Sequence, residues 1–118
     1  MVGRNILIVE DEPLIAMMLE DFLDSLGHRV VGTLDSLEDA LARVELDGID
    51  VAILDVHLKD GKNIWPVADR LAGRGIPFVL ATGGHTEAPP AAHADAPVLA
   101  KPYTIDAIEP ALEKAFSA

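Results

Sequence analysis

The sequence predicts an α/β fold: a doubly wound, five-stranded parallel sheet with helices on both faces. Short unbroken runs of apolar, often β-branched residues alternate five times with longer stretches whose apolar residues recur every three or four positions. The runs are typical of strands, and the stretches are typical of amphipathic helices. Strands that are apolar on both sides are buried on both faces, which indicates a parallel sheet covered by helices.

The first strand is expected over residues 6–9, and a helix follows it from Pro13, a residue that suits the first helical turn. Gly27 is expected to end this helix, and a second strand covers residues 29–33. The apolar positions of the helix that are expected to face the core are Leu14, Ile15, Met18, Leu19, Phe22 and Leu26.

The second helix is expected to begin after Ser36, which suits an N-cap, and to end near Gly48. The third strand covers residues 51–54 and leads directly into Asp55. A third helix is expected over residues 63–72, because two glycines follow it and the apolar spacing within it is helical.

The last part of the chain holds a fourth strand at residues 78–81, a fifth at 98–100 and a helix over 104–116. Between the two strands, residues 83–97 contain several glycines and prolines, so any helix there is expected to be short and to start near the prolines. Pro110 lies inside the last helix, where it removes one backbone hydrogen bond and costs about 3 kcal/mol unless the helix bends.

The composition predicts one compact acidic domain over residues 1–118. The chain has 9 Lys and Arg against 20 Asp and Glu, which gives a formal net charge of −11, and half of its residues are hydrophobic. Folding at this length removes roughly two-thirds of the unfolded surface from water, enough for one core. The negative charge argues against nucleic acid and anionic membranes as partners, because phosphates attract clustered basic residues and these are scattered.

The absence of cysteine and of long apolar segments excludes further classes of function. The chain has no cysteine, which excludes disulfides, Cys-zinc sites and Cys nucleophiles and is consistent with a reducing compartment. The apolar run that follows the first five residues, residues 6–9, is only four residues long, too short for a signal peptide, and no apolar run approaches the length of a membrane span. We therefore expect a cytoplasmic protein.

Polar side chains follow four of the five predicted strands. Right-handed crossovers bring the carboxyl ends of parallel strands to one edge, where such sheets bind ligands. Two carboxylates about 4 Å apart repel by about 4 kcal/mol at an effective dielectric near 20, so acids gathered at this edge need a cation. Mg²⁺ suits them, since it is held by one or two carboxylates, a carbonyl and waters. The residues expected at this edge are Glu10, Asp11, Glu12, Asp55, Thr82, Gly83, Lys101 and Pro102.

The side chains beside the acids complete a phosphoryl site. Lys101 supplies a positive charge, Thr82 supplies a hydroxyl donor, and Asp55 is a carboxylate nucleophile. Taken singly, Lys101 is more simply a surface lysine and Thr82 a strand residue. Their convergence on one edge with the acidic residues favours a shared site.

Four segments carry a resemblance to a known family. They are residues 6–13 (Ile-Leu-Ile-Val-Glu-Asp-Glu-Pro), 52–55 (Ala-Ile-Leu-Asp), 81–83 (Ala-Thr-Gly) and 101–103 (Lys-Pro-Tyr). Over essentially the whole chain they resemble the receiver domains of two-component response regulators: the first strand with its acidic pair, the phosphoacceptor strand, the switch threonine, and the lysine with its cis-proline turn. The resemblance implies a flavodoxin-like receiver fold with strand order 2-1-3-4-5.

The resemblance also implies a role for each matching residue. Asp55 would take a phosphoryl group from a histidine kinase, and Asp55 and Asp11 would ligate Mg²⁺ directly. Glu10 would act on the metal through water, and the backbone carbonyl of His57 would be a further ligand. Thr82 and Lys101 would bind the phosphoryl oxygens.

A single-domain response regulator of this kind is a phosphoacceptor and not an enzyme, apart from self-phosphorylation and self-dephosphorylation. Because no output domain is expected, the signal would leave by phosphorylation-dependent binding of an effector, by relay to a histidine phosphotransferase, or by draining phosphoryl groups from a kinase.

Residues 76–84 and 96–102 resemble a subgroup with a Phe-Ala-Thr-Gly signature, often stand-alone receivers partnered with HWE-type histidine kinases of alphaproteobacteria, and residues 65–69 support it. Three features depart from these patterns. Leu80 and Gly84 stand where the subgroup has Phe and an aromatic residue. Val98 stands where most receivers have Tyr or Phe, so the usual aromatic switch is absent, and the loop at residues 58–61 is shorter and lacks its proline.

Two other functions compete with this one. A small Mg²⁺-dependent phosphatase with an aspartate nucleophile usually has a second acid two residues after the nucleophile, where this chain has His57. A flavodoxin-like cofactor binder needs glycines in its first loop to cradle phosphate, and residues 10–13 are acidic and glycine-free.

Because Val98 has no ring, we expect phosphorylation to act through residues 83–96, by an order-to-disorder or helix-shift change biased by Thr82. Trp65 is expected as a partly buried packing residue. The four histidines are expected in turns or on the surface: His28, His57, His85 and His93.

Overall fold

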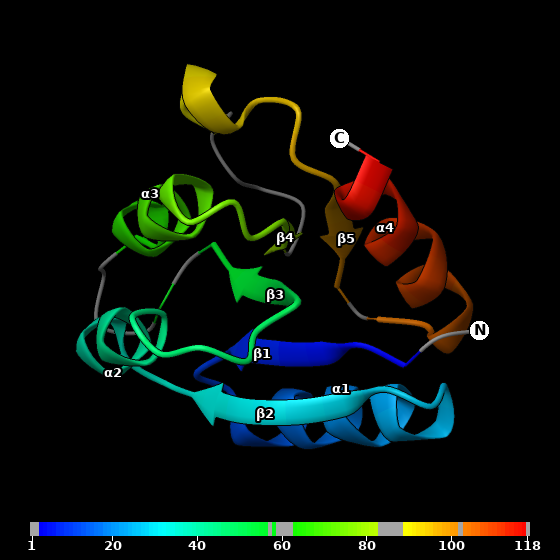
Figure 1. Ribbon diagram of the computed structural model, residues 1–118. Coiled ribbons are helices and arrows are strands. Elements are labelled where there is room, and N and C mark those ends of the chain that lie inside the picture. The colour runs from blue at the N-terminus through cyan, green and yellow to red at the C-terminus, as the bar shows by residue number, and fades with distance from the viewer. Residues whose placement is uncertain (1–2, 57, 59–62, 83–88, 102, 118) are drawn as a thin grey trace.

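The computed structural model describes residues 3–56, 58, 63–82, 89–101 and 103–117 (Figure 1). Its centre is a five-stranded sheet in the order β2-β1-β3-β4-β5, and all paired strands are parallel. This confirms the predicted fold class and strand order. The strands are β1 (Asn5–Val9), β2 (Arg29–Leu34), β3 (Val51–Asp55), β4 (Phe78–Thr82) and β5 (Val98–Ala100).

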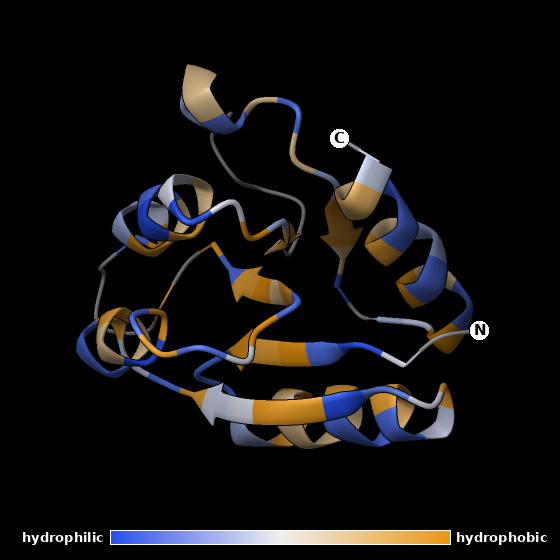
Figure 2. Ribbon diagram, viewed as in Figure 1, coloured by the Kyte–Doolittle hydropathy of each residue, from blue (hydrophilic) through white to orange (hydrophobic). Residues whose placement is uncertain are grey.

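Helices cover both faces of the sheet. One core cluster packs Leu19 and Leu23 of α1 and Ile108 of α4 against β1, β3, β4 and β5. The other packs Val67 and Leu71 of α3, together with residues of α2, against the opposite face of the sheet. Figure 2 shows the strands mostly in hydrophobic colours and the surrounding helices with hydrophobic and hydrophilic residues mixed. The helices are α1 (Pro13–Ser25), α2 (Leu37–Arg43), α3 (Trp65–Gly73) and α4 (Ile105–Ser117), with a short 3₁₀ helix η1 (Ala91–His93).

Helix α1 buries a narrower stripe than its apolar spacing predicts. Ala16, Leu19 and Leu23 are buried, but Leu14 is 79 % exposed and Met17 is also exposed. Leu14 and Met17 lie three residues apart, on the side of the helix turned away from the buried stripe. The expectation that Leu14 faces the core is therefore wrong.

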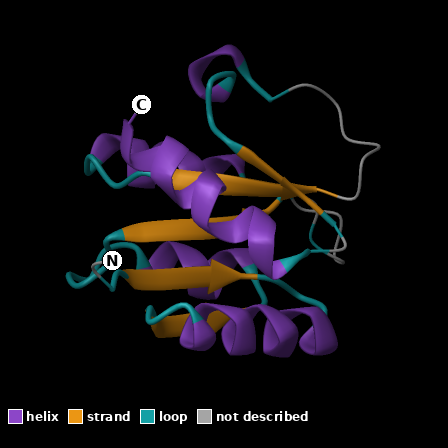
Figure 3. Cartoon of the chain, turned by 90° about the vertical axis from the view of Figure 1, so that its right-hand side faces the viewer, coloured by secondary structure: helices purple, strands orange, loops and turns teal. Residues whose placement is uncertain are grey.

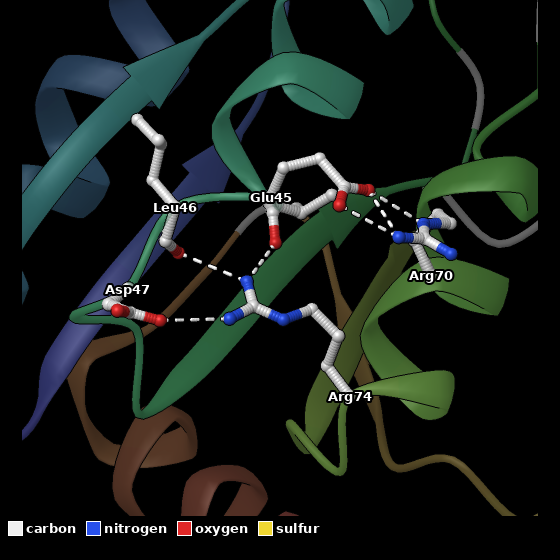
Figure 4. A network of polar contacts seen from close by, with 6 residues as sticks. Glu45, Leu46, Asp47, Arg70 and Arg74 are labelled. Carbon is white, nitrogen blue, oxygen red and sulfur yellow. Dashed lines mark hydrogen bonds and ion pairs between the residues drawn. The ribbon is translucent and has the colours of Figure 1, made fainter.

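Helix α2 is shorter than predicted. The hydroxyl of Ser36 caps it by accepting from the backbone N–H of Asp39 at 3.2 Å, as expected, but it ends at Arg43 rather than near Gly48. After the helix, the guanidinium of Arg74, the residue that follows α3, donates to the carbonyls of Val44 and Leu46 (Figure 4).

The turn between α2 and β3 is thereby clamped to α3. Arg74 also contacts the carboxylate of Asp47 at 3.0 Å, and Arg70 donates two hydrogen bonds of 2.7 Å to the Glu45 carboxylate (Figure 4). Gly48 ends the turn with a φ of 97°, a conformation that favours glycine.

The segments near the two chain ends are joined to each other. The guanidinium carbon of Arg4 lies 4.0 Å from the ring centroid of Phe116 in α4. The backbone N–H of Arg4 donates to Nδ1 of His28 at 3.0 Å, and Nε2 of the same ring pairs with the Glu109 carboxylate of α4. His28 lies at the turn between α1 and β2, as predicted, and it is buried there.

In the described residues, the β4–β5 connection and α4 have the structure that the sequence predicts. The short helix η1 begins directly after Pro90, as the prolines predict. Helix α4 continues through Pro110, and Pro110 and Asp106, whose carbonyl loses its helical donor, are both exposed, so water can replace that donor. None of the helices in the described part of the chain has the length and apolar composition needed to span a bilayer.

Candidate functional site

The strand register brings the predicted site residues to one edge of the sheet. Val9 of β1 pairs with Leu54 of β3, so Glu10 and Asp55, the next residues on each strand, are neighbours. Thr82 is the last residue of β4, and its carbonyl accepts from the backbone N–H of Lys101 at 2.9 Å. The carboxyl ends of the strands meet on the side of the molecule opposite to the chain ends (Figure 3).

Three carboxylates form an acidic cluster at this edge. Glu10, Asp11 and Asp55 each place an oxygen so that these atoms all lie within 4.8 Å of one another. Glu10 is 2 % exposed and Asp55 is 5 % exposed, whereas Asp11 is half-buried. Carboxylate oxygens in a cluster of this size are the donor set of a hard divalent cation such as Mg²⁺.

Lys101 lies between two of these acids. Its Nζ is 2.9 Å from Oε1 of Glu10 and 3.1 Å from Oδ2 of Asp55. The sequence predicts repulsion that a cation must relieve, and in the structure the Lys101 ammonium supplies part of that positive charge. The topology predicts that the lysine and the acids share an edge, but not that the lysine pairs with both.

The electrostatics of the cluster give its two buried acids different pKa values. Burial, reinforced by the neighbouring Glu10, raises the pKa of Asp55 from 3.8 to about 7 against the opposing effect of Lys101. Burial also raises the pKa of Glu10, but hydrogen bonds to Lys101 and Asp55 outweigh it and hold that pKa below its usual value. Burial lowers the pKa of Lys101, but the two carboxylates raise it overall. The cluster therefore holds one firmly ionised acid and one that protonates near neutral pH.

Tyr103 is a member of the site to which the sequence analysis assigns no role. It is buried, and its hydroxyl donates to Oε1 of Glu10 at 3.3 Å. Burial, together with the negative charges of Glu10 and Asp55, raises its pKa well above the usual value, so the hydroxyl keeps its proton. The other oxygen of Glu10 accepts from the backbone N–H of Glu12 at 3.2 Å. The sequence does offer a signal for this role, because Tyr103 lies only two residues after Lys101 and can therefore place its hydroxyl at the same edge of the sheet.

Some of the remaining predicted site residues lie within the described part of the chain, and others lie outside it. Thr82 is half-buried at the end of β4, beside the cluster. Val98, which stands at the position of the usual aromatic switch and has no ring, lies on β5 and is 55 % exposed. His57, Gly83 and Pro102 lie outside the described residues.

A second cluster of side chains joins η1 to α3 and to Phe78 of β4. His93 is 5 % exposed, which overturns the expectation of a surface histidine. Its Nε2 lies 2.6 Å from Oδ1 of Asp69, and its ring stacks on Trp65 with centroids 6.1 Å apart. The same ring and that of Phe78 form a T-shaped pair with centroids 5.4 Å apart. Trp65 is half-buried, as predicted.

A family model described as "Response regulator receiver domain" matches residues 6–113. The chain belongs to the response regulator receiver domain family. The receiver is therefore a component of two-component signalling. Receiver domains bind Mg²⁺ at an acidic pocket, and this chain has an acidic cluster of Glu10, Asp11 and Asp55.

Two solved structures of SdrG are similar to this receiver over nearly its whole length. The solution structure of SdrG from Sphingomonas melonis Fr1 is 55 % identical with a TM-score of 0.87, covering 97 % of both chains. The BeF3-activated conformation of SdrG from Pseudomonas melonis Fr1 is 56 % identical with a TM-score of 0.80, covering 97 % of this receiver and 98 % of that chain.

Among curated proteins, the phyllosphere-induced regulator PhyR of Methylorubrum extorquens is 37 % identical over 90 residues. That alignment covers 68 % of this receiver but only 31 % of PhyR, so the chain spans about a third of the length of this relative.

Proposed function

We propose that the receiver accepts a phosphoryl group on Asp55 from a phosphohistidine of a histidine kinase. The observation that carries the proposal is the joint placement of three carboxylates within 4.8 Å and of the Lys101 ammonium 3.1 Å from Asp55. A buried nucleophile needs such a cation beside it, because the entering group brings further negative charge.

In the proposed step, an oxygen of Asp55 attacks phosphorus while the phosphorus–nitrogen bond of the phosphohistidine breaks. The electron pair of that bond returns to the imidazole, and an acyl phosphate remains on Asp55. Asp55 must be ionised to attack, so its pKa of about 7 places the reactive form near neutral pH. Lys101 and Thr82 are proposed to bind the phosphoryl oxygens, the first by charge and the second by its hydroxyl.

Mg²⁺ fits the donor set of the cluster and would neutralise charge on the carboxylates and the phosphoryl oxygens when bound. We propose Asp11 and Asp55 as direct ligands and Glu10 as a ligand through water. The backbone carbonyl of His57 is proposed as a further ligand, and it lies outside the described residues.

We further propose that residues 1–118 act as one receiver domain that signals in the cytoplasm through its own surface. The near-complete mutual coverage with SdrG supports this proposal. The outputs are binding of an effector, relay to a histidine phosphotransferase, or draining of a kinase, and the kinase is proposed to be of the HWE type on the subgroup resemblance.

Intact mass after incubation with phosphoramidate and Mg²⁺ tests the proposal. We expect one added phosphoryl group on the wild type and none on Asp55→Asn. Asp106→Asn, which removes an exposed carboxylate of α4, is the control and should be phosphorylated like the wild type. Phosphoramidate turnover with no adduct would favour the aspartate-nucleophile phosphatase, and an adduct that survives in Asp55→Asn would refute the assignment of the nucleophile.

A further inference from the structure

Tyr103 contacts the phosphoryl site through its hydroxyl. Its ring belongs to the core cluster on the α1 and α4 face of the sheet, and its hydroxyl reaches Oε1 of Glu10 at 3.3 Å. Because the ring is held by packing, the hydroxyl is presented to Glu10 in a fixed place.

The same oxygen of Glu10 has a second donor, Lys101, at 2.9 Å. Lys101 is shared, since its Nζ also lies 3.1 Å from Asp55. The proposed function needs this ammonium at the phosphoryl oxygens, which draws it away from Glu10. Glu10 is 2 % exposed, and a buried carboxylate that loses its charged partner is strongly disfavoured unless other donors remain.

We propose that Tyr103 is a positioning residue of the phosphoryl site, whose hydroxyl holds the Glu10 carboxylate while Lys101 moves from Glu10 to the phosphoryl group. This inference rests on the proposed function. With Tyr103 donating to Oε1 and the backbone N–H of Glu12 donating to Oε2, Glu10 keeps one donor on each oxygen after Lys101 leaves. Tyr103 thereby lowers the cost of releasing the lysine.

A purely structural role for Tyr103 makes a different prediction. In that case Glu10 serves only to satisfy a buried hydroxyl, and Tyr103→Phe, which keeps the ring and removes the hydroxyl, leaves phosphorylation unchanged. If the hydroxyl acts through the charge of Glu10, its effect depends on that charge. A double-mutant cycle over Tyr103 and Glu10 separates the two roles.

The experiment measures the initial rate of phosphorylation by phosphoramidate with Mg²⁺ in the wild type, Tyr103→Phe, Glu10→Gln and the double variant. We expect Tyr103→Phe to slow the reaction about fivefold to tenfold, the effect of losing one ordinary intramolecular hydrogen bond. In the Glu10→Gln background the same change should alter the rate less than about twofold, because releasing Lys101 no longer leaves a buried anion. Circular dichroism checks that each variant is folded.

Equal rates for the wild type and Tyr103→Phe, or an equal loss in both backgrounds, would overturn the inference. A wild type that gains no phosphoryl group would instead refute the proposed function, so the two failures are distinguishable.

A second measurement needs no variant, because Tyr103 is the only tyrosine in the sequence. Ultraviolet resonance Raman bands of tyrosine report how strongly the hydroxyl donates. We expect a shift toward stronger donation when the wild type binds beryllofluoride with Mg²⁺, since Glu10 then relies on Tyr103. Unchanged bands on a protein shown by mass to react at Asp55 would count against the inference.

Discussion

Asp55 and Glu10 are chemically similar residues whose buried positions make them behave differently. Lys101 contacts both, at 3.1 and 2.9 Å, but Tyr103 and the backbone of Glu12 donate only to Glu10. Asp55 is left with the higher pKa, about 7. Burial and the neighbouring Glu10 raise the pKa of Asp55, whereas hydrogen bonds to Lys101 and Asp55 lower the pKa of Glu10, so the acid proposed as the nucleophile is the one that protonates near neutral pH.

The raised pKa of Asp55 predicts how stability depends on pH in the metal-free protein. The folded state holds the proton up to about pH 7 and the unfolded state only to about 3.8, so this contribution is present at low pH and is lost as pH rises through 7. Between pH 5 and 8, the unfolding free energy of the wild type should therefore fall by at least about 1 kcal/mol more than that of Asp55→Asn.

Urea unfolding in the presence of a chelator measures this difference at each pH. Asp106→Asn serves as the control for the loss of one charge. A constant difference between Asp55→Asn and the wild type across this range would contradict the raised pKa.

At the scale of elements, η1 and α3 form a contact that a conformational change can break. The pairing of His93 with Asp69 and its stacking on Trp65 fasten the β4–β5 connection to α3. We expect phosphorylation or beryllofluoride to loosen this contact, so that amide exchange rises at residues 89–96. The expected change at residues 83–88 stays a prediction, because these residues lie outside those described.

Trp65 reports the same event, since it is the only tryptophan in the sequence and stacks on His93. Its emission should change on phosphorylation in the wild type and not in His93→Gln, which lacks the stacked ring. Exchange that changes only in α1 and α2, with residues 89–96 equally protected in both states, would exclude this mechanism.

Arg70 of α3 and Arg74, the residue that follows the helix, allow a comparison of hydrogen bonds to backbone carbonyls with a surface ion pair. Arg74 donates to two backbone carbonyls of the α2–β3 turn, whereas Arg70 pairs with the half-exposed Glu45. Arg74→Ala should lower the unfolding free energy by about 1–3 kcal/mol, since it leaves backbone acceptors without a donor. Arg70→Ala should cost less than about 1 kcal/mol.

Urea unfolding of both variants tests the difference, with phosphorylation by phosphoramidate as a control that neither should change. Equal losses of stability in the two variants would show that the turn does not depend on Arg74.

For the whole molecule, metal binding should appear as a gain in stability. A ligand at a hundredfold excess over its dissociation constant stabilises the folded state by about 2.7 kcal/mol. Mg²⁺ should therefore raise the melting temperature of the wild type. Asp11→Ala should lose this response and melt at a higher temperature than the wild type without metal, because one repelling charge is gone.

Thermal unfolding with and without saturating Mg²⁺ measures both effects. A wild-type melting temperature that does not respond to Mg²⁺ would contradict the metal site.

The global arrangement is predictable from sequence because it depends on patterns that the backbone repeats. Unbroken apolar runs locate the strands, and parallel topology then places Glu10, Asp55, Thr82 and Lys101 at one edge. What the sequence does not reveal depends on side chains from distant elements. His28 meets Glu109, which lies 81 positions away, and His93 fits a pocket formed by α3 and β4. Neither position has a local signal that distinguishes a buried histidine from an exposed one.

The contact between Arg4 and Phe116 has a practical consequence for handling the protein. Because these residues touch, and the chain ends lie across the sheet from the acidic edge, an affinity tag or surface tether at either end points away from Asp55 (Figure 3). A receiver immobilised on a sensor chip through such a tether presents its reactive edge to the flowing solution. Joining the two ends by a short peptide would give a circularised chain in which that edge is undisturbed.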